Sequence, residues 1–138
     1  MHPDLVRVVA LAIEHTSVDF MVIEGVRSRE RQAELVKAGA SQTMNSRHIT
    51  GHAVDLGAVV DGSLRWDWPL YPQIARAMQR ASREAKVPVR WGGCWQLLST
   101  FDDPEEAVAA YTAQRRAQGR RAFLDGPHFE LPADRYPA

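Results

Sequence analysis

This chain of 138 residues has little cysteine, no net charge and no long apolar segment. Cys94 is the only cysteine, so no internal disulfide can form and the chain is compatible with synthesis in a reducing compartment. No apolar run approaches the roughly 20 residues that span a bilayer. The N-terminus also lacks the pattern of a secretion signal. We therefore expect a soluble protein without an integral membrane segment.

The basic and acidic residues balance, with 17 of each. Nucleic-acid binding needs an excess of positive charge or a broad basic face, so we expect no nucleic-acid partner. The only basic cluster consists of Arg115, Arg116, Arg120 and Arg121. We interpret it as a solvated helix face in preference to an anion-binding patch.

Apolar periodicity and turn residues predict one α+β domain over residues 1–138. Ser28 and Asp103 are expected to cap helices, and Asp61-Gly62 to form a hairpin turn. Pro88 places its strand near a sheet edge. The predicted helices cover residues 4–14, 29–38, 71–86 and 104–118, and the predicted strands cover 18–24, 53–60, 64–66, 87–91 and 128–131.

Two short segments far apart in the chain carry the functional signal. Residues 46–55 read Ser-Arg-His-Ile-Thr-Gly-His-Ala-Val-Asp and contain His48 and Asp55, and His128 lies far downstream. Two imidazoles and one carboxylate are the usual ligand set of a catalytic zinc site, in which the fourth position stays open. Asp125 precedes His128 by three residues, where its carboxylate could act as a general base.

The local sequence also explains how these side chains would meet. His48 and Asp55 lie seven residues apart across a junction between a loop and a strand. Gly51 would give the backbone a tight bend, and Ala53 would leave room beside the metal. Alternation along the strand points Asp55 toward the site while its neighbours pack in the core. His128 begins another strand, which would bring it to the same point.

These residues resemble the zinc peptidases of bacterial cell-wall peptides. That family includes D-Ala-D-Ala carboxypeptidases and dipeptidases and the phage L-alanyl-D-glutamate endopeptidases. The resemblance spans residues 20–131, nearly the whole chain. Four family motifs are matched in order, by Arg27 and Ser28, by residues 46–55, by residues 91–95, and by Asp125 with His128.

The resemblance implies a small antiparallel sheet flanked by helices, as in hedgehog and D,D-peptidase domains. It implies that His48, Asp55 and His128 bind Zn²⁺ and that Asp125 is the general base and acid. An aspartate at this position is similar to the endopeptidase branch. The implied activity is hydrolysis of the L-alanyl-D-glutamate bond of the peptidoglycan stem peptide, in host lysis by a phage endolysin.

Other residues of these motifs would bind the substrate. Arg27 would stabilise the developing oxyanion or hold a substrate carboxylate, and its alternative role is a surface salt bridge. Ser46 would bind substrate or orient His48, or else cap a local turn. Trp91 and Trp95 would line a groove for the stem peptide, and the alternative is a place in the core.

Two other functions stay open: a D-Ala-D-Ala carboxypeptidase or dipeptidase, and a non-catalytic binding module that keeps zinc for structure alone. Cys94 stands where many relatives carry an acid. Residues 99–122 exceed the link expected before Asp125, and this inserted helix would wall the cleft or act as a lid. We expect a monomer, synthesised in the host cytoplasm, that reaches the cell wall after release across the inner membrane.

Overall fold

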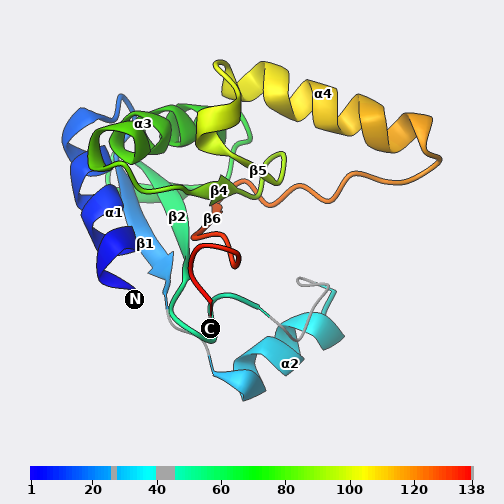
Figure 1. Ribbon diagram of the computed structural model, residues 1–138, viewed down its shortest axis with the longest axis horizontal. Coiled ribbons are helices and arrows are strands. Elements are labelled where there is room, and N and C mark those ends of the chain that lie inside the picture. The colour runs from blue at the N-terminus through cyan, green and yellow to red at the C-terminus, as the bar shows by residue number, and fades with distance from the viewer. Residues whose placement is uncertain (26–27, 40–45, 138) are drawn as a thin grey trace.

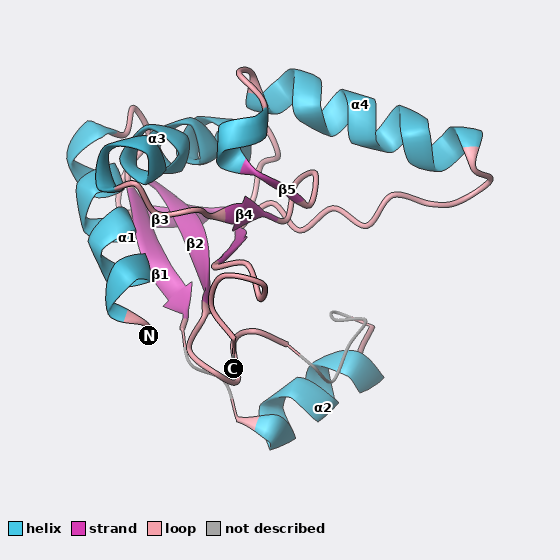
Figure 2. Ribbon diagram, viewed as in Figure 1, coloured by secondary structure: helices cyan, strands magenta, loops and turns pink. Residues whose placement is uncertain are grey.

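The computed structural model describes residues 1–25, 28–39 and 46–137. This part of the chain forms one α+β domain with four α-helices and an antiparallel sheet of six strands (Figures 1 and 2). The predicted fold class is therefore confirmed. The elements are α1 (Pro3–His15), β1 (Phe20–Glu24), α2 (Arg29–Lys37), β2 (Ala53–Val60), β3 (Ser63–Arg65), α3 (Leu70–Ala85), β4 (Arg90–Trp91), β5 (Gln96–Leu97), a short 3₁₀ helix (Leu98–Thr100), α4 (Pro104–Ala117) and β6 (His128–Glu130).

The sheet is organised around β2, which pairs with β1 on one side and with both β6 and β3 on the other. The strand order is β1-β2-β6-β4-β5. The remaining strand, β3, pairs only with the end of β2, at residues 58–60. Asp61 and Gly62 connect β2 to β3 with φ angles of 52° and 79°. Two consecutive positive φ angles are typical of the tight turn that suits a hairpin, which confirms the predicted turn.

The helices begin where capping side chains predict. The Oγ atom of Ser28 accepts a hydrogen bond from the backbone N–H of Arg31 (3.0 Å) at the start of α2. The Oδ1 atom of Asp103 accepts one from Glu105 (2.9 Å) at the start of α4. Each bond satisfies an amide group that the first helical turn leaves without a partner.

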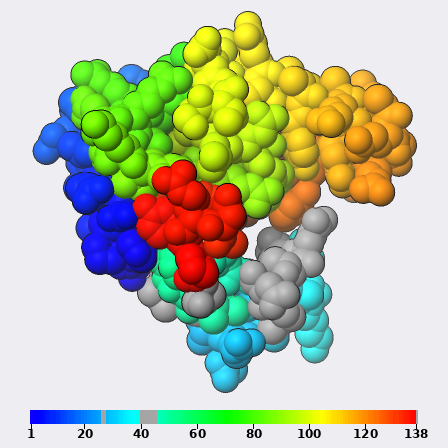
Figure 3. Space-filling view, viewed as in Figure 1, coloured from blue at the N-terminus to red at the C-terminus, as the bar shows by residue number. Residues whose placement is uncertain are grey.

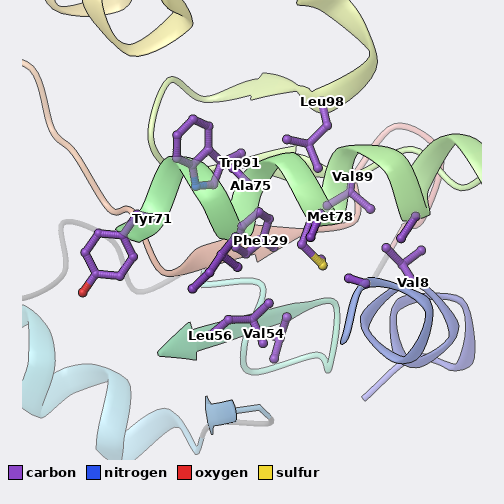
Figure 4. Close-up of a cluster of buried hydrophobic side chains, with 14 of the residues drawn as sticks. Val8, Val54, Leu56, Tyr71, Ala75, Met78, Val89, Trp91, Leu98 and Phe129 are labelled. Carbon is purple, nitrogen blue, oxygen red and sulfur yellow. The ribbon is translucent and has the colours of Figure 1, made fainter. Parts of the chain in front are cut away.

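The hydrophobic core lies between one face of the sheet and the helices α1 and α3 (Figure 4). Alternate residues of β2, Val54, Leu56 and Ala58, point into this core and are fully buried. The residues between them point to the opposite face because side chains alternate along a strand. The opposite face is where the functional residues gather. The other core residues include Leu5, Val8 and Ala12 from α1, Ile74, Ala75, Met78 and Ala81 from α3, and Val89, Trp91, Leu98 and Phe129.

The prediction for residues 87–91 is partly wrong. Only Arg90 and Trp91 form the strand, but β4 does lie near an edge of the sheet, where the two-residue strand β5 is its outer neighbour. Pro88 precedes the paired residues, so its missing N–H removes no hydrogen bond of the sheet. The two-residue strand β5 and the 3₁₀ helix were not predicted, because such short elements carry no periodic signal.

Gln79 fastens α3 to the segment after β5. Its side chain is buried, and its Nε2 atom donates to the carbonyl oxygens of Leu98 (2.9 Å) and Phe101 (2.6 Å). A buried carbonyl without a hydrogen-bond donor destabilises the folded state, because it has lost its contact with water and gains no bond in return. This one side chain therefore stabilises the connection that leads into α4.

We predict that Gln79→Ala lowers the free energy of unfolding by about 1–3 kcal/mol, because the buried carbonyl of Leu98 loses its donor and that of Phe101 keeps only the longer contact with Arg83 (3.5 Å). Gln114→Ala, at an exposed position of α4, is the matched control and should change stability by less than about 0.5 kcal/mol. Urea unfolding followed by circular dichroism measures both variants. Equal stabilities for the two variants would contradict this role of Gln79.

Candidate metal centre

The structure brings His48, Asp55 and His128 together at one point. The Nε2 atom of His48 lies 3.1 Å from Oδ1 of Asp55 and 3.2 Å from Nδ1 of His128. The third side of the triangle, from Nδ1 of His128 to Oδ1 of Asp55, is 3.4 Å. Tetrahedral zinc with bonds of about 2.0–2.1 Å separates its ligand atoms by about 3.3 Å. The three atoms therefore fit three corners of such a site without rearrangement.

The backbone produces this triangle through strand register. Asp55 of β2 lies directly opposite His128 of β6. Asp55 points away from the core, while its neighbours Val54 and Leu56 are fully buried. His48 comes from the turn just before β2, where Gly51 has a φ of 79° that favours glycine. The predicted arrangement of loop, strand and adjacent strand is the one observed.

Both histidines are oriented by hydrogen bonds from their other ring nitrogen. Nδ1 of His48 lies 2.9 Å from the carbonyl oxygen of Gly25, which can only accept. Nε2 of His128 lies 2.7 Å from Oε1 of Glu130. These partners accept a hydrogen bond from the outer nitrogen of each ring, so the inner nitrogen beside Asp55 is the one that can offer a lone pair to a metal. Metal-binding histidines are commonly held in this way.

Glu130 is a functional residue that the sequence reasoning missed. It lies two residues after His128 on β6, so both side chains share one face of the sheet. Arg90 of β4 is its neighbour across the sheet, and Nη1 of Arg90 lies 3.7 Å from Oε2 of Glu130. The Nε atom of Arg90 also donates to the carbonyl of Trp95 (2.9 Å). The sequence did contain a signal for Glu130, because side chains alternate along the predicted strand over residues 128–131 and so place Glu130 on the same face as His128.

The electrostatics of the cluster favour a positive charge at its centre. Burial alone lowers the pKa of His128, but hydrogen bonds with the carboxylates of Asp55 and Glu130 outweigh it and raise that pKa to about 9. Burial alone raises the pKa of Asp55, and hydrogen bonds with both histidines outweigh it and hold that pKa well below its usual value. In the metal-free protein, the proton on His128 supplies the positive charge beside Asp55. A bound cation would take the place of that proton.

Asp125 and His128 occupy the two ends of one tight turn. The backbone N–H of His128 donates to the carbonyl of Asp125 (3.1 Å), and Asp125 in turn donates to the carbonyl of Gly92 (3.0 Å). A Cβ atom at Gly92 would lie 2.4 Å from the carbonyl oxygen of Asp125, so only glycine permits this approach. The negative charge of Asp125 also contributes to the raised pKa of His128, as expected for a carboxylate near the triangle.

The prediction that Trp91 lines a substrate groove is wrong. Trp91 pairs with Phe129 on the core face of the sheet and is fully buried. Its indole N–H donates to the carbonyl of Gly126 (2.8 Å), so it holds the turn that carries Asp125. Trp95 is half-buried, and its ring centroid lies 5.4 Å from that of His128.

The remaining predicted residues take different positions. The Oγ atom of Ser46 accepts a hydrogen bond from the backbone N–H of His48 (3.2 Å), which is the turn cap that the sequence left open as an alternative. Arg27 lies outside the described residues. Cys94 is buried, its burial raises the thiol pKa, and it does not belong to the cluster of candidate metal ligands.

Comparisons with known proteins agree with this geometry. A family model described as phage L-alanyl-D-glutamate peptidase matches residues 1–132. The L-alanyl-D-glutamate peptidase of Escherichia phage T5 is 26% identical over 133 residues, which cover 94% of this chain and 87% of that protein. The peptidase of the same name from Listeria phage A118 is 32% identical over 82 residues, which cover 59% of this chain and 28% of that protein.

Two solved structures resemble the fold. The crystal structure of the Serratia marcescens L-Ala D-Glu endopeptidase ChiX is 45% identical, with a TM-score of 0.75, and the match covers 100% of this chain and 85% of that one. The vancomycin resistance D,D-dipeptidase VanXYg is 20% identical, with a TM-score of 0.52 over 95% of this chain and 50% of that one, and shares the fold. The chain belongs to the phage L-alanyl-D-glutamate peptidase family.

Proposed function

We propose that this protein is a zinc peptidase that hydrolyses the L-alanyl-D-glutamate bond of peptidoglycan stem peptides, and that residues 1–138 form its single catalytic domain. The observation that carries the proposal is the triangle of ligand atoms from His48, Asp55 and His128, with edges of 3.1–3.4 Å. Family membership and the likeness to an endopeptidase structure support the L-alanyl-D-glutamate bond as the one that is hydrolysed. All three proposed ligands come from one chain, so the site needs no partner subunit.

The donor set supports zinc as the metal. Two imidazole nitrogens and one carboxylate oxygen are typical of catalytic zinc, and three protein ligands leave one coordination position for water or substrate. The burial of His48 and His128 matters here, because a buried carboxylate needs a positive partner, which zinc supplies when it replaces the proton of His128. We assign the metal to zinc on this chemistry.

The residues around the metal divide the work of hydrolysis. Zinc, when bound, polarises the scissile carbonyl and lowers the pKa of the attacking water. Asp125 accepts the proton of that water and then delivers it to the departing amine of D-glutamate. Glu130 holds the ring of His128 so that its Nδ1 lone pair faces the metal. Gly92 and Trp91 fix the turn that carries Asp125.

Substrate contacts would come from Trp95 and from Arg27, and Ser46 would position a metal ligand. Trp95 offers a half-buried aromatic face beside His128. Arg27 is retained from the family motif as a partner for a substrate carboxylate or for the developing oxyanion. Ser46, whose hydroxyl already caps the turn before His48, contributes to the position of that ligand.

The place of action follows from the proposed substrate. Peptidoglycan lies outside the cytoplasm, so the protein must pass the inner membrane of its host to reach it. Within the described residues, no helix is both long and apolar enough to cross a membrane. From the likeness to phage peptidases, we propose that a separate factor opens the membrane during host lysis.

Digestion of purified peptidoglycan tests the proposed function. The protein loaded with zinc should release fragments that begin with D-glutamate and leave L-alanine on the muramyl sugar, as mass spectrometry of the products would show. A chelator should stop the release, and added zinc should restore it. Release of free D-alanine would instead indicate a D,D-carboxypeptidase or dipeptidase. No release by any preparation would indicate a binding module.

The same digest tests whether Asp125 is the general base. Asp125→Ala should lower the rate by roughly 10²–10⁴-fold, the usual contribution of a general base, while zinc content and thermal stability stay close to those of the wild type. Asp102→Ala, at an exposed position, is the matched control and should retain full activity. An Asp125→Ala variant that keeps more than about a tenth of the activity would remove the assigned base.

We predict that Glu130→Gln weakens zinc binding by roughly 10–100-fold, because His128 loses the carboxylate that orients it. Competition with a fluorescent chelator measures the affinity without any need for turnover. Glu14→Gln, at an exposed position of α1, provides the control and should bind zinc like the wild type. Equal affinities in the three proteins would show that Glu130 does not position the ligand.

Zinc binding should depend on pH through His128. This histidine carries a proton below its pKa of about 9 in the metal-free protein, and the proton must leave before Nδ1 can bind zinc. The apparent affinity should therefore rise by about tenfold per pH unit between pH 6 and 8, with release of at least about one proton per ion at pH 7. Titration calorimetry in buffers of different ionisation enthalpy counts the protons. Binding without proton release would contradict the assignment.

A further inference from the structure

An arm projects from the domain between β5 and the site. We define the arm as α4 together with residues 118–124, which return toward Asp125 (Figure 1). The buried residues of α4 are Pro104, Ala107 and Val108, all in its first half. The second half extends away from the body, on the opposite side of the molecule from α1 (Figure 3). The hydrophobic core therefore does not account for the length of the arm.

The arm is nevertheless an ordered unit. Nε and Nη2 of Arg115 donate to the carbonyl of Arg121 at 3.3 and 3.2 Å, which ties the returning segment to the helix. The backbone N–H of Phe123 donates to the hydroxyl of Tyr111 (3.3 Å). At its base, the indole N–H of Trp95 donates to the carbonyl of Phe123 (2.7 Å). These contacts hold the arm in place relative to the site.

The tip of the arm, which we define as residues 115–121, is strongly basic. No acidic residue occurs between Glu106 and Asp125, while this interval holds four arginines. Arg116, Arg120 and Arg121 are exposed, and within the described residues their guanidinium groups form no ion pair. Arginines elsewhere on the surface do pair with acids, as Arg76 does with Asp103. No acid in the described part of the chain neutralises this charge. Arg120 and Arg121 lie beyond the end of α4, so the four arginines do not form the single solvated helix face that the sequence suggested.

An aromatic path links the site to this charge. The ring of Trp95 lies 5.4 Å from that of His128 and stacks on that of Phe123 at 6.0 Å. Arg121 is four residues from Asp125, so their Cα atoms are at most about 14 Å apart. This span corresponds to about four extended residues, the length of a short peptide. Arg121 therefore lies no more than about one short-peptide length from Asp125, a distance over which a polymer held at the metal can contact both.

We propose that the tip of the arm binds the carboxylates of stem peptides that neighbour the one being cleaved in polymeric peptidoglycan. This inference rests on the proposed function, which supplies an acidic polymer as the substrate. Guanidinium groups form strong charge-assisted bonds with carboxylates. The outer half of α4 has only alanines and Tyr111 as apolar residues, so it lacks the large side chains that anchor a helix in a membrane surface.

Co-sedimentation with insoluble peptidoglycan tests the arm separately from catalysis. The variant Arg116→Gln, Arg120→Gln, Arg121→Gln should bind at least fivefold more weakly at low salt than the wild type. The control Arg7→Gln, Arg80→Gln, Arg83→Gln removes the same charge from side chains that are 55%, 63% and 51% exposed. It should bind like the wild type. Peptidoglycan whose carboxylates have been amidated with ethanolamine should abolish the difference between wild type and arm variant.

A second readout is the ratio of hydrolysis rates on insoluble peptidoglycan and on a small muropeptide. This ratio should fall by at least fivefold in the arm variant. Equal loss on both substrates, or binding unchanged by amidation, would overturn the proposal. Preferential binding of the arm to vesicles of phosphatidylglycerol and phosphatidylcholine, or to duplex DNA, would overturn it too, in favour of another partner. A wild type that binds through the arm without cleaving would instead refute the proposed function.

Discussion

The pairing of Asp55 with His128 across β2 and β6 is the contact on which the whole site depends. Side chains alternate along strands, so this register puts both residues on the open face while Leu56 and Phe129 pack into the core. A slip of one residue would exchange the two sets and would bury a carboxylate in an apolar layer. The same pattern that stabilises the fold therefore also specifies the proposed metal site.

The site also depends on groups that do not touch the proposed metal. Gly25 and Glu130 orient the two imidazole rings through hydrogen bonds, and Arg90 contacts the carboxylate of Glu130. Gly92 allows the turn of Asp125 to pack against β4, where any larger residue would collide with its backbone. Glu130 and Arg90 act from β6 and β4, and Gly25 and Gly92 lie directly after β1 and β4. A catalytic arrangement of this kind is thus distributed over β1, β2, β4 and β6.

Much of this arrangement was predictable from the sequence. The proposed ligands His48, Asp55 and His128 lie in motifs with fixed spacing, and the predicted strand over residues 53–60 matches β2. Trp91 was misassigned because a tryptophan beside a functional motif suggests a groove, whereas its pairing partner decides which face it occupies. Glu130 was overlooked although strand alternation already placed it beside His128. Pairing partners such as Arg90 and Glu130 lie far apart in the chain, so their contact appears only in three dimensions.

X-ray absorption spectroscopy at the zinc edge, on protein holding one equivalent of metal, tests the central claim most directly. The account predicts a first shell of nitrogen and oxygen atoms at about 2.0 Å, with the multiple-scattering pattern of two imidazoles and no sulfur. A sulfur shell at about 2.3 Å, which would implicate Cys94, or a shell without two imidazoles would contradict it.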